Sequence, residues 1–149
     1  MAPDFTLYAT PDQKISLGEF KGKRLVIAFY PADWSPVCGD QMALYNESLV
    51  FLHRHNANLV GISVDGKWCH LSFSQDRNLH FPLLADFEPK GAVAKLYEAF
   101  DDTIGECKRA LYILDKEGII RWSHLSPTGI NPGVDGILDA LETMNNSKK

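Results

Sequence analysis

A single cysteine stands where an apolar strand gives way to an amphipathic helix. Cys38 follows the apolar run 24–30 and a short loop, and it falls in the first turn of the expected helix. That turn presents unpaired backbone N–H groups and the positive end of the helix dipole, which both favour a thiolate, the nucleophilic form of cysteine. Ser35 lies three residues earlier, so its hydroxyl is within reach of the sulfur or of a bound substrate. Pro31 and Pro36 restrict the loop because each ring fixes φ.

The simpler interpretation is that Cys38 is a buried structural residue, which is the more common role of a free cysteine. We favour a reactive thiol, because the loop before it is irregular and polar and lies at a strand-to-helix turn. The chain has three cysteines at wide spacing, which do not form a disulfide framework and indicate a reducing compartment.

The elements that position Cys38 alternate between strand and helix. Buried-strand patterns at 24–30 and 58–64 are each followed by a helical pattern, which predicts an α/β fold with helices on both faces of a mixed central sheet. The working site of such a sheet lies beyond the carboxyl ends of its strands. Further strands are expected at 5–8, 14–17, 81–85, 110–114 and 119–124, and helices at 38–52, 66–75, 90–100 and from 132 onward. This order matches a thioredoxin-like sheet, with parallel strands first and a hairpin at the end.

Composition and charge narrow the class of protein. The 149 residues suit one domain spanning 1–149, with residues 145–149 expected to fray. The net charge is −4 and no basic tract appears, which argues against a nucleic-acid partner. No apolar run approaches the roughly 20 residues that span a bilayer. The first residues lack the pattern of a signal peptide, so we expect a cytoplasmic location.

Four sequence blocks together resemble a known family. Pro31, Ser35 and Cys38 spell P-x3-[ST]-x2-C. The other blocks are Ala2-Pro3-Asp4-Phe5, Phe81-Pro82-Leu83-Leu84-Ala85-Asp86, and Arg109 directly before Ala110-Leu111-Tyr112-Ile113-Leu114-Asp115. In this order they resemble the peroxiredoxins, the AhpC/TSA family, over nearly the whole chain.

The resemblance implies a role for each matching residue. Cys38 corresponds to the peroxidatic cysteine, and Ser35 to the hydroxyl that hydrogen-bonds the bound peroxide. Pro31 corresponds to the residue that shields the thiolate, and Arg109 to the guanidinium that stabilises it. The implied activity is a thiol peroxidase that reduces hydrogen peroxide and alkyl hydroperoxides through a Cys38 sulfenic acid. It needs no metal or organic cofactor, takes electrons from thioredoxin or a similar dithiol protein, and is compatible with a homodimer.

Regeneration of the thiol leaves two interpretations open. Cys69 is the candidate resolving cysteine, or it packs beside Trp68. A disulfide needs Cα atoms roughly 5.5 Å apart, so the helix turn that holds Cys38 would have to unwind before the two sulfurs meet. If Cys69 is not used, the protein is a one-cysteine enzyme that an external thiol reduces directly. Cys107, at the end of a polar loop, is expected to be a peripheral thiol.

Other classes of protein are less well supported. A thiol–disulfide oxidoreductase would need a second cysteine where Gln41 stands, and we give Gln41 no catalytic role. A redox sensor that passes its oxidation to a partner protein keeps Cys38 reactive but turns over slowly. A zinc site formed by Cys69 and His70 with Cys107 and His124 lacks the C-x2-C spacing typical of such sites.

Overall fold

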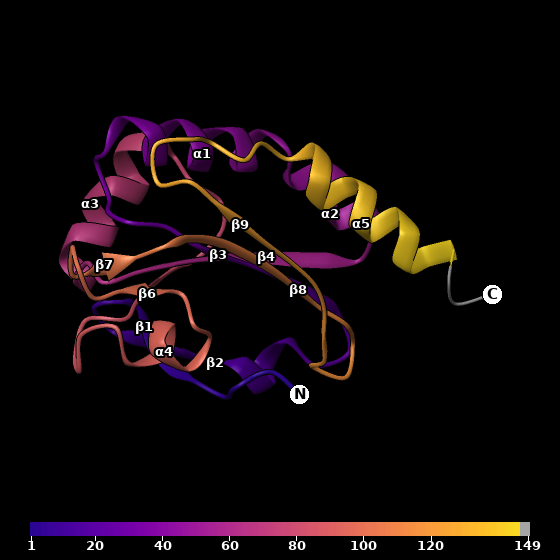
Figure 1. Cartoon of the computed structure of the whole chain (residues 1–149), viewed down its shortest axis with the longest axis horizontal. Helices are drawn as coiled ribbons and strands as arrows, with labels where there is room; N and C mark the ends of the chain where they lie inside the picture. The colour runs from indigo at the N-terminus through magenta and orange to yellow at the C-terminus, as the bar shows by residue number, and fades with distance from the viewer. Residues whose placement is uncertain (147–149) are drawn as a thin grey trace.

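The computed structural model describes residues 1–146. A mixed seven-stranded sheet forms the centre of the fold (Figure 1). The strand order is β2-β1-β5-β4-β3-β8-β9; β3, β4 and β5 are parallel, and the other neighbours are antiparallel. A separate pair is formed by β6 and β7. The strands are β1 Thr6–Thr10, β2 Gln13–Ser16, β3 Arg24–Phe29, β4 Ala57–Ser63, β5 Leu83–Ala85, β6 Phe100–Asp101, β7 Glu106–Cys107, β8 Arg109–Leu114 and β9 Ile120–Ser126.

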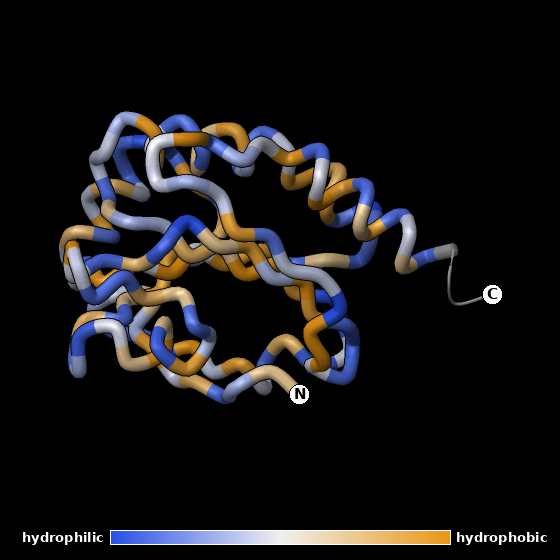
Figure 2. Tube along the Cα trace, in the orientation of Figure 1, coloured by the Kyte–Doolittle hydropathy of each residue, from blue (hydrophilic) through white to orange (hydrophobic). Residues whose placement is uncertain are grey.

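Helices cover both faces of the sheet, as the sequence predicts (Figure 1). The face that carries the cysteine helix is covered by α1 Pro36–Glu47, α2 Leu49–Arg54, α3 Lys67–Arg77 and α5 Asp135–Asn146. The opposite face holds α4 Ala92–Leu96 and the 3-10 turn η1 Leu17–Phe20. Apolar colour in Figure 2 follows the central strands, and polar colour follows much of the outer loops and helix surfaces.

The buried strand β3 supplies side chains to both core layers. Val26 and Ala28 pack with α1 and α5, whereas Ile27 and Phe29 pack with α4 on the other face. All six residues of β3 are buried, because both faces of the strand are covered. The end of this strand therefore sits in a fixed place, and the loop that leads to Cys38 starts from it.

The expected helix 38–52 is divided in two at Ser48. The Ser48 hydroxyl donates to the Leu44 carbonyl at 2.8 Å, and the Ser48 amide is shared between the Leu44 and Tyr45 carbonyls, both at 3.1 Å. A serine side chain that bonds the backbone in this way competes with the regular helical ladder. The chain therefore bends between α1 and α2 instead of continuing straight.

Two other helix predictions are corrected by the structure. The expected helix 90–100 is reduced to α4, since Glu98 takes φ of +59° and turns the chain toward β6. Leu96, the last residue of α4, is 59% exposed, whereas Val93 and Ala94 are buried. At the C-terminus, Asn145 was expected to fray, but it lies in α5 and its Oδ1 accepts a 2.5 Å hydrogen bond from Arg24. Residues 147–149 lie outside the described residues. Within 1–146, no helix is both long and apolar enough to cross a membrane.

Candidate active site

Cys38 is the third residue of α1, and Ser35 caps the helix. Ser35 has extended backbone angles, and its Oγ accepts the Cys38 amide hydrogen at 3.3 Å. Pro36 occupies the first helical position, where a missing N–H costs nothing. Because the Ser35 oxygen is the acceptor in this bond, its hydroxyl hydrogen is available to a substrate. The sulfur therefore lies at the positive end of the helix beside a spare donor.

Arg109 brings a buried positive charge to this sulfur from another strand. It is the first residue of β8 and is 1% exposed. Its Nη1 donates to Cys38 Sγ at 3.3 Å, and its Nε and Nη2 donate to the Thr128 carbonyl at 2.9 and 2.6 Å. These contacts hold the guanidinium plane in one orientation. A charge-assisted donor at this distance stabilises a thiolate.

Two residues without a role in the sequence analysis complete the arrangement around Arg109. The Gln41 Oε1 accepts from Arg109 Nη1 at 2.7 Å, and the Gln41 Nε2 donates to the Tyr45 hydroxyl at 3.0 Å. The Tyr45 hydroxyl in turn donates to the Gly133 carbonyl at 3.3 Å. Burial raises the pKa of Tyr45 to about 12, so it remains a donor at neutral pH. The sequence did contain one signal for these two residues. Gln41 and Tyr45 follow Cys38 by three and seven residues, a spacing that places all three on one face of the same helix.

The structure thus brings Cys38, Ser35 and Arg109 into one connected site. Pro31 lies in the same loop, buried just after β3. Cys38 itself is fully buried, within the core layer that α1 and α5 share.

A buried histidine ties the loop before Cys38 to α3. The Asp33 carboxylate accepts from the Tyr30 hydroxyl at 2.6 Å and lies 2.7 Å from His70 Nδ1. His70 Nε2 lies 3.0 Å from the Leu84 carbonyl, so both ring nitrogens face oxygen atoms. The side chains of His70 and Asp33 are at most 1% exposed. The pair therefore fixes the loop against the sheet and α3.

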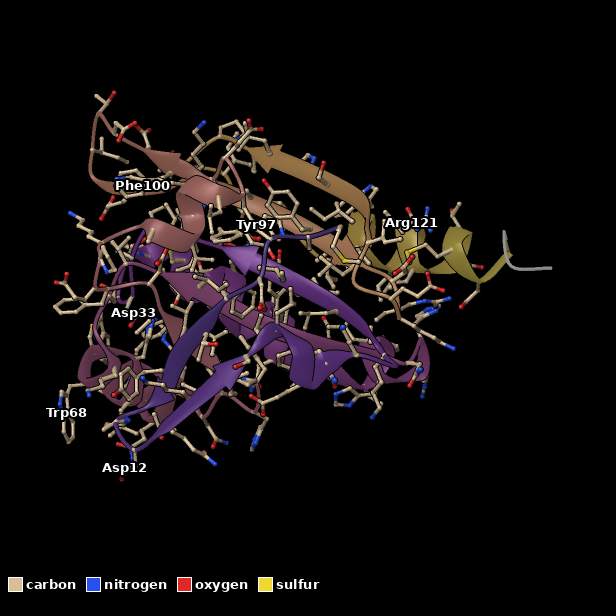
Figure 3. The ribbon with its side chains drawn as sticks, turned by 90° about the horizontal axis from the view of Figure 1, so that it is seen from below. Asp12, Asp33, Trp68, Tyr97, Phe100 and Arg121 are labelled. Atoms are coloured by element: carbon tan, nitrogen blue, oxygen red, sulfur yellow. The ribbon has the colours of Figure 1, made fainter. Side chains whose placement is uncertain are left out.

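Cys69 lies in the first turn of α3 beside two carboxylates. Its Sγ is 4.0 Å from Asp65 Oδ1, and partial burial, followed by the Asp33 and Asp65 charges, raises the pKa of the thiol to about 11. Trp68 is 68% exposed and projects outward, at the same end of the molecule as Asp33 (Figure 3). The surroundings of Cys69 are therefore the Asp33 loop and Asp65 as well as its own helix.

The expectation that Cys107 is a peripheral thiol is wrong. Cys107 is fully buried in β7, in the core layer on the α4 face. Burial, reinforced by nearby carboxylates, raises the pKa of this thiol well above its ordinary range. Among residues 1–146, the cluster with the spacing of metal ligands is Asp33, Asp65 and His70, and it includes neither Cys107 nor His124. Asp33 and His70 use the nearest of these atoms to bond each other.

A cysteine in the first turn of a helix, above a mixed α/β sheet and against a buried arginine, defines a thiol-dependent redox protein. The model of the AhpC/TSA family matches residues 1–123 of this chain. A chloroplastic 2-Cys peroxiredoxin of Hordeum vulgare is 31% identical over 159 residues, covering 99% of this chain and 75% of that protein. A mitochondrial thioredoxin-dependent peroxide reductase of Drosophila melanogaster is 32% identical over 151 residues, covering 95% of this chain and 64% of that protein.

Solved structures agree with these relatives. The reduced 2-Cys peroxiredoxin of Plasmodium vivax superimposes with a TM-score of 0.90 at 26% identity, covering 99% of this chain and 81% of that one. The AhpC of Enterococcus faecalis gives 0.88 at 26% identity, with coverages of 97% and 89%. The fold is thioredoxin-like, as predicted. The chain belongs to the AhpC/TSA family, and it is a peroxiredoxin, an oxidoreductase of the thiol peroxidase class.

Proposed function

We propose that this peroxiredoxin reduces hydrogen peroxide and small alkyl hydroperoxides through a sulfenic acid at Cys38. The observation that carries the proposal is the 3.3 Å contact between Arg109 Nη1 and Cys38 Sγ. Of the three cysteines, Cys38 alone is contacted by a cationic side chain among the hydrogen bonds of residues 1–146. Cys69 faces carboxylates and Cys107 lies in an apolar core layer.

In the proposed reaction, the Cys38 thiolate attacks one peroxide oxygen and the O–O bond breaks. The sulfur is oxidised to the sulfenic acid, and the second oxygen leaves as water or an alcohol once it takes a proton. Negative charge moves from sulfur to the leaving oxygen, so donors must already point at both. The Ser35 hydroxyl and the Arg109 guanidinium are placed to do this, with Gln41 and Tyr45 holding the guanidinium. Cys38 exposes no surface, so substrate entry requires a local movement of the residues that cover it.

Electrons for the return step would come from thioredoxin or a similar dithiol protein. The name of the similar Drosophila protein supports this choice. Two rival functions share the fold: a thiol–disulfide oxidoreductase and a redox sensor that oxidises a partner protein. Position 41 is Gln, so the first rival lacks the second cysteine of C-x-x-C. Multiple turnovers of hydrogen peroxide with a thioredoxin system would exclude the sensor.

Replacing Cys38 with serine is expected to abolish peroxide consumption, because the hydroxyl of serine is not ionised at neutral pH. The measurement is hydrogen peroxide decay with a thioredoxin system as the electron source. Cys107→Ala serves as the control, since that thiol lies in the opposite core layer, and it should consume peroxide at the parental rate. Undiminished consumption by the Cys38 variant would contradict the proposed function.

A homodimer formed along β9 fits the sheet. Among the described strands, β9 pairs only with β8, which leaves its other edge without a strand partner. Leu125 on this strand is 61% exposed. An open edge of this length pairs readily with a second copy. Sedimentation velocity should therefore give a dimer, and a Leu125→Lys variant should shift the protein toward monomer; a monomeric parent protein would contradict this assembly.

A cytoplasmic location remains part of the proposal. The cysteine pattern supports it, since three widely spaced cysteines do not make a disulfide framework. The similar proteins named above include a mitochondrial and a chloroplastic one. Fractionation of the source cells followed by immunodetection tests this point directly.

A further inference from the structure

Asp65 contacts both the loop that leads to Cys38 and the thiol of Cys69. It lies between β4 and α3, and one of its carboxylate oxygens, Oδ2, accepts the Asp33 amide hydrogen at 2.8 Å and the Ser63 hydroxyl at 2.5 Å. The Asp33 amide belongs to the loop that leads to Cys38. Asp65 is thereby fixed in place from both sides, by the cysteine loop and by β4.

The other carboxylate oxygen of Asp65 faces Cys69. Its Oδ1 lies 4.0 Å from Cys69 Sγ, and no other hydrogen bond to Oδ1 is found among residues 1–146. Asp33 also interacts with the Cys69 thiol, but both of its oxygens already bond Tyr30 and His70. Asp65 Oδ1 has no second hydrogen-bond partner among residues 1–146, so it is the carboxylate oxygen with the most capacity to accept the Cys69 proton.

Cys69 also borders the segment that would carry Cys38 to it. The Asp33 and Trp34 side chains lie beside the Cys69 thiol. Cys38 lies four positions after Trp34, and an extended chain of four residues spans about 13 Å.

In the first turn of α1, the Cys38 amide donates to the Ser35 hydroxyl at 3.3 Å and the Gly39 amide donates to the Ser35 carbonyl at 2.8 Å, so unwinding this turn breaks two hydrogen bonds. Gly39 lowers the cost of unwinding, because glycine is a poor helix former. Unwinding that turn gives Cys38 the freedom to approach Cys69.

We propose that Asp65 is the general base of a resolving step in which Cys69 attacks the Cys38 sulfenic acid. This inference rests on the proposed function. The Cys69 sulfur forms the S–S bond, the Cys38 S–O bond breaks, and the departing hydroxide becomes water by taking a proton. Asp65 Oδ1 accepts the Cys69 proton as the bond forms and releases it to solvent afterwards. Cys69 is oxidised, and the sulfenic sulfur is reduced to the disulfide level by the same electron pair.

The same carboxylate has two opposing effects, and their balance makes the proposal testable. As a neighbouring charge, Asp65 disfavours the Cys69 thiolate, together with burial and Asp33. As a proton acceptor, it removes the need for a thiolate to exist before the attack. If only the charge mattered, removing it would speed disulfide formation. If the base matters, removing it slows the same step.

Asp65→Asn separates these effects with little change of shape. The amide oxygen can still accept from the Asp33 amide and Ser63, while the group that faces Cys69 becomes a donor. Reduced protein is mixed with hydrogen peroxide, quenched at intervals, and analysed for dimedone-trapped Cys38 and for the Cys38–Cys69 disulfide. We expect normal formation of the sulfenic acid and disulfide formation slowed by about a hundredfold, within the usual range for a general base. Asp76→Asn, an exposed carboxylate change on the same helix, should form the disulfide at the parental rate.

The outcomes distinguish this inference from the function on which it rests. Disulfide formation in Asp65→Asn that is as fast as in the parent, or faster, overturns the role of Asp65. A stable Cys38 sulfenic acid with no Cys38–Cys69 bond in the parent protein also overturns it and leaves the peroxidase intact. Absence of any sulfenic acid at Cys38 removes the proposed function itself.

A measurement on the unmodified protein covers the case in which the variant does not fold. With Asp65 as base, the attack does not depend on a preformed thiolate, so the rate of disulfide formation should change little between about pH 6 and about pH 8. Attack by a preformed thiolate with a pKa of about 11 would instead make the rate rise about tenfold per pH unit. The second profile contradicts the proposal.

Discussion

Arg109→Lys is expected to lower kcat/KM for hydrogen peroxide by about 10²–10³-fold, the range seen when one preorganised donor is lost. Lysine keeps the charge but presents it as a single ammonium on a flexible stem. It cannot contact Cys38 Sγ, Gln41 Oε1 and the Thr128 carbonyl at once, as the guanidinium does. The lysine ammonium would then be the only donor in place of the guanidinium, and it would not be held in an orientation that points at the thiolate and the leaving oxygen.

Stopped-flow oxidation of the reduced protein by peroxide measures this effect without the reductant. The matched control is Arg121→Lys, because Arg121 pairs with Asp115 on the surface and is 53% exposed. That variant should react at the parental rate. Equal rates for the Arg109 variant and the parent would remove Arg109 from the site.

His70→Gln is expected to lower the free energy of unfolding by about 1–3 kcal/mol, the usual cost of leaving buried hydrogen-bonding groups without their partner. Glutamine does not reproduce the shape of the imidazole ring, and the Asp33 carboxylate would lose the contact with His70 Nδ1 and keep the hydrogen bond from the Tyr30 hydroxyl. The Leu84 carbonyl would also lose its partner at 3.0 Å. Both losses loosen the loop before Cys38, so peroxide reactivity should fall as well.

Urea unfolding followed by circular dichroism gives this free energy. His80→Gln provides the control, because the His80 side chain is exposed in the loop after α3 and its change should cost little. A His70 variant as stable as the parent would show that the His70–Asp33 contact contributes nothing to the fold.

The sequence predicted those parts of the site whose position depends on neighbouring residues in the chain. The strand-to-helix turn placed Cys38 in the first turn of α1, and Ser35 stands at the capping position that its type favours. Alternation of strand and helix predicted the sheet. Arg109 was found by its match to a family pattern, since nothing local shows that the start of β8 faces α1.

The remaining features depend on tertiary contacts that no local pattern contains. The sequence indicates no catalytic role for Gln41 and places His70 only in a poorly supported zinc site, yet both are buried by elements distant in sequence. Cys107 sits among polar neighbours in sequence, but β6 and β7 pair and carry it inward. The break at Ser48 arises from a side-chain hydrogen bond, which the apolar spacing of the helix does not register.

The central claim is that peroxide oxidises Cys38, and peptide mapping tests it most directly. Fully reduced protein receives one equivalent of hydrogen peroxide, free thiols are then alkylated under denaturing conditions, and each cysteine peptide is identified by mass. We predict that Cys38 escapes alkylation and appears in a bond to Cys69, while Cys107 is alkylated completely. Alkylation of Cys38 to the same extent as Cys107 would contradict the claim.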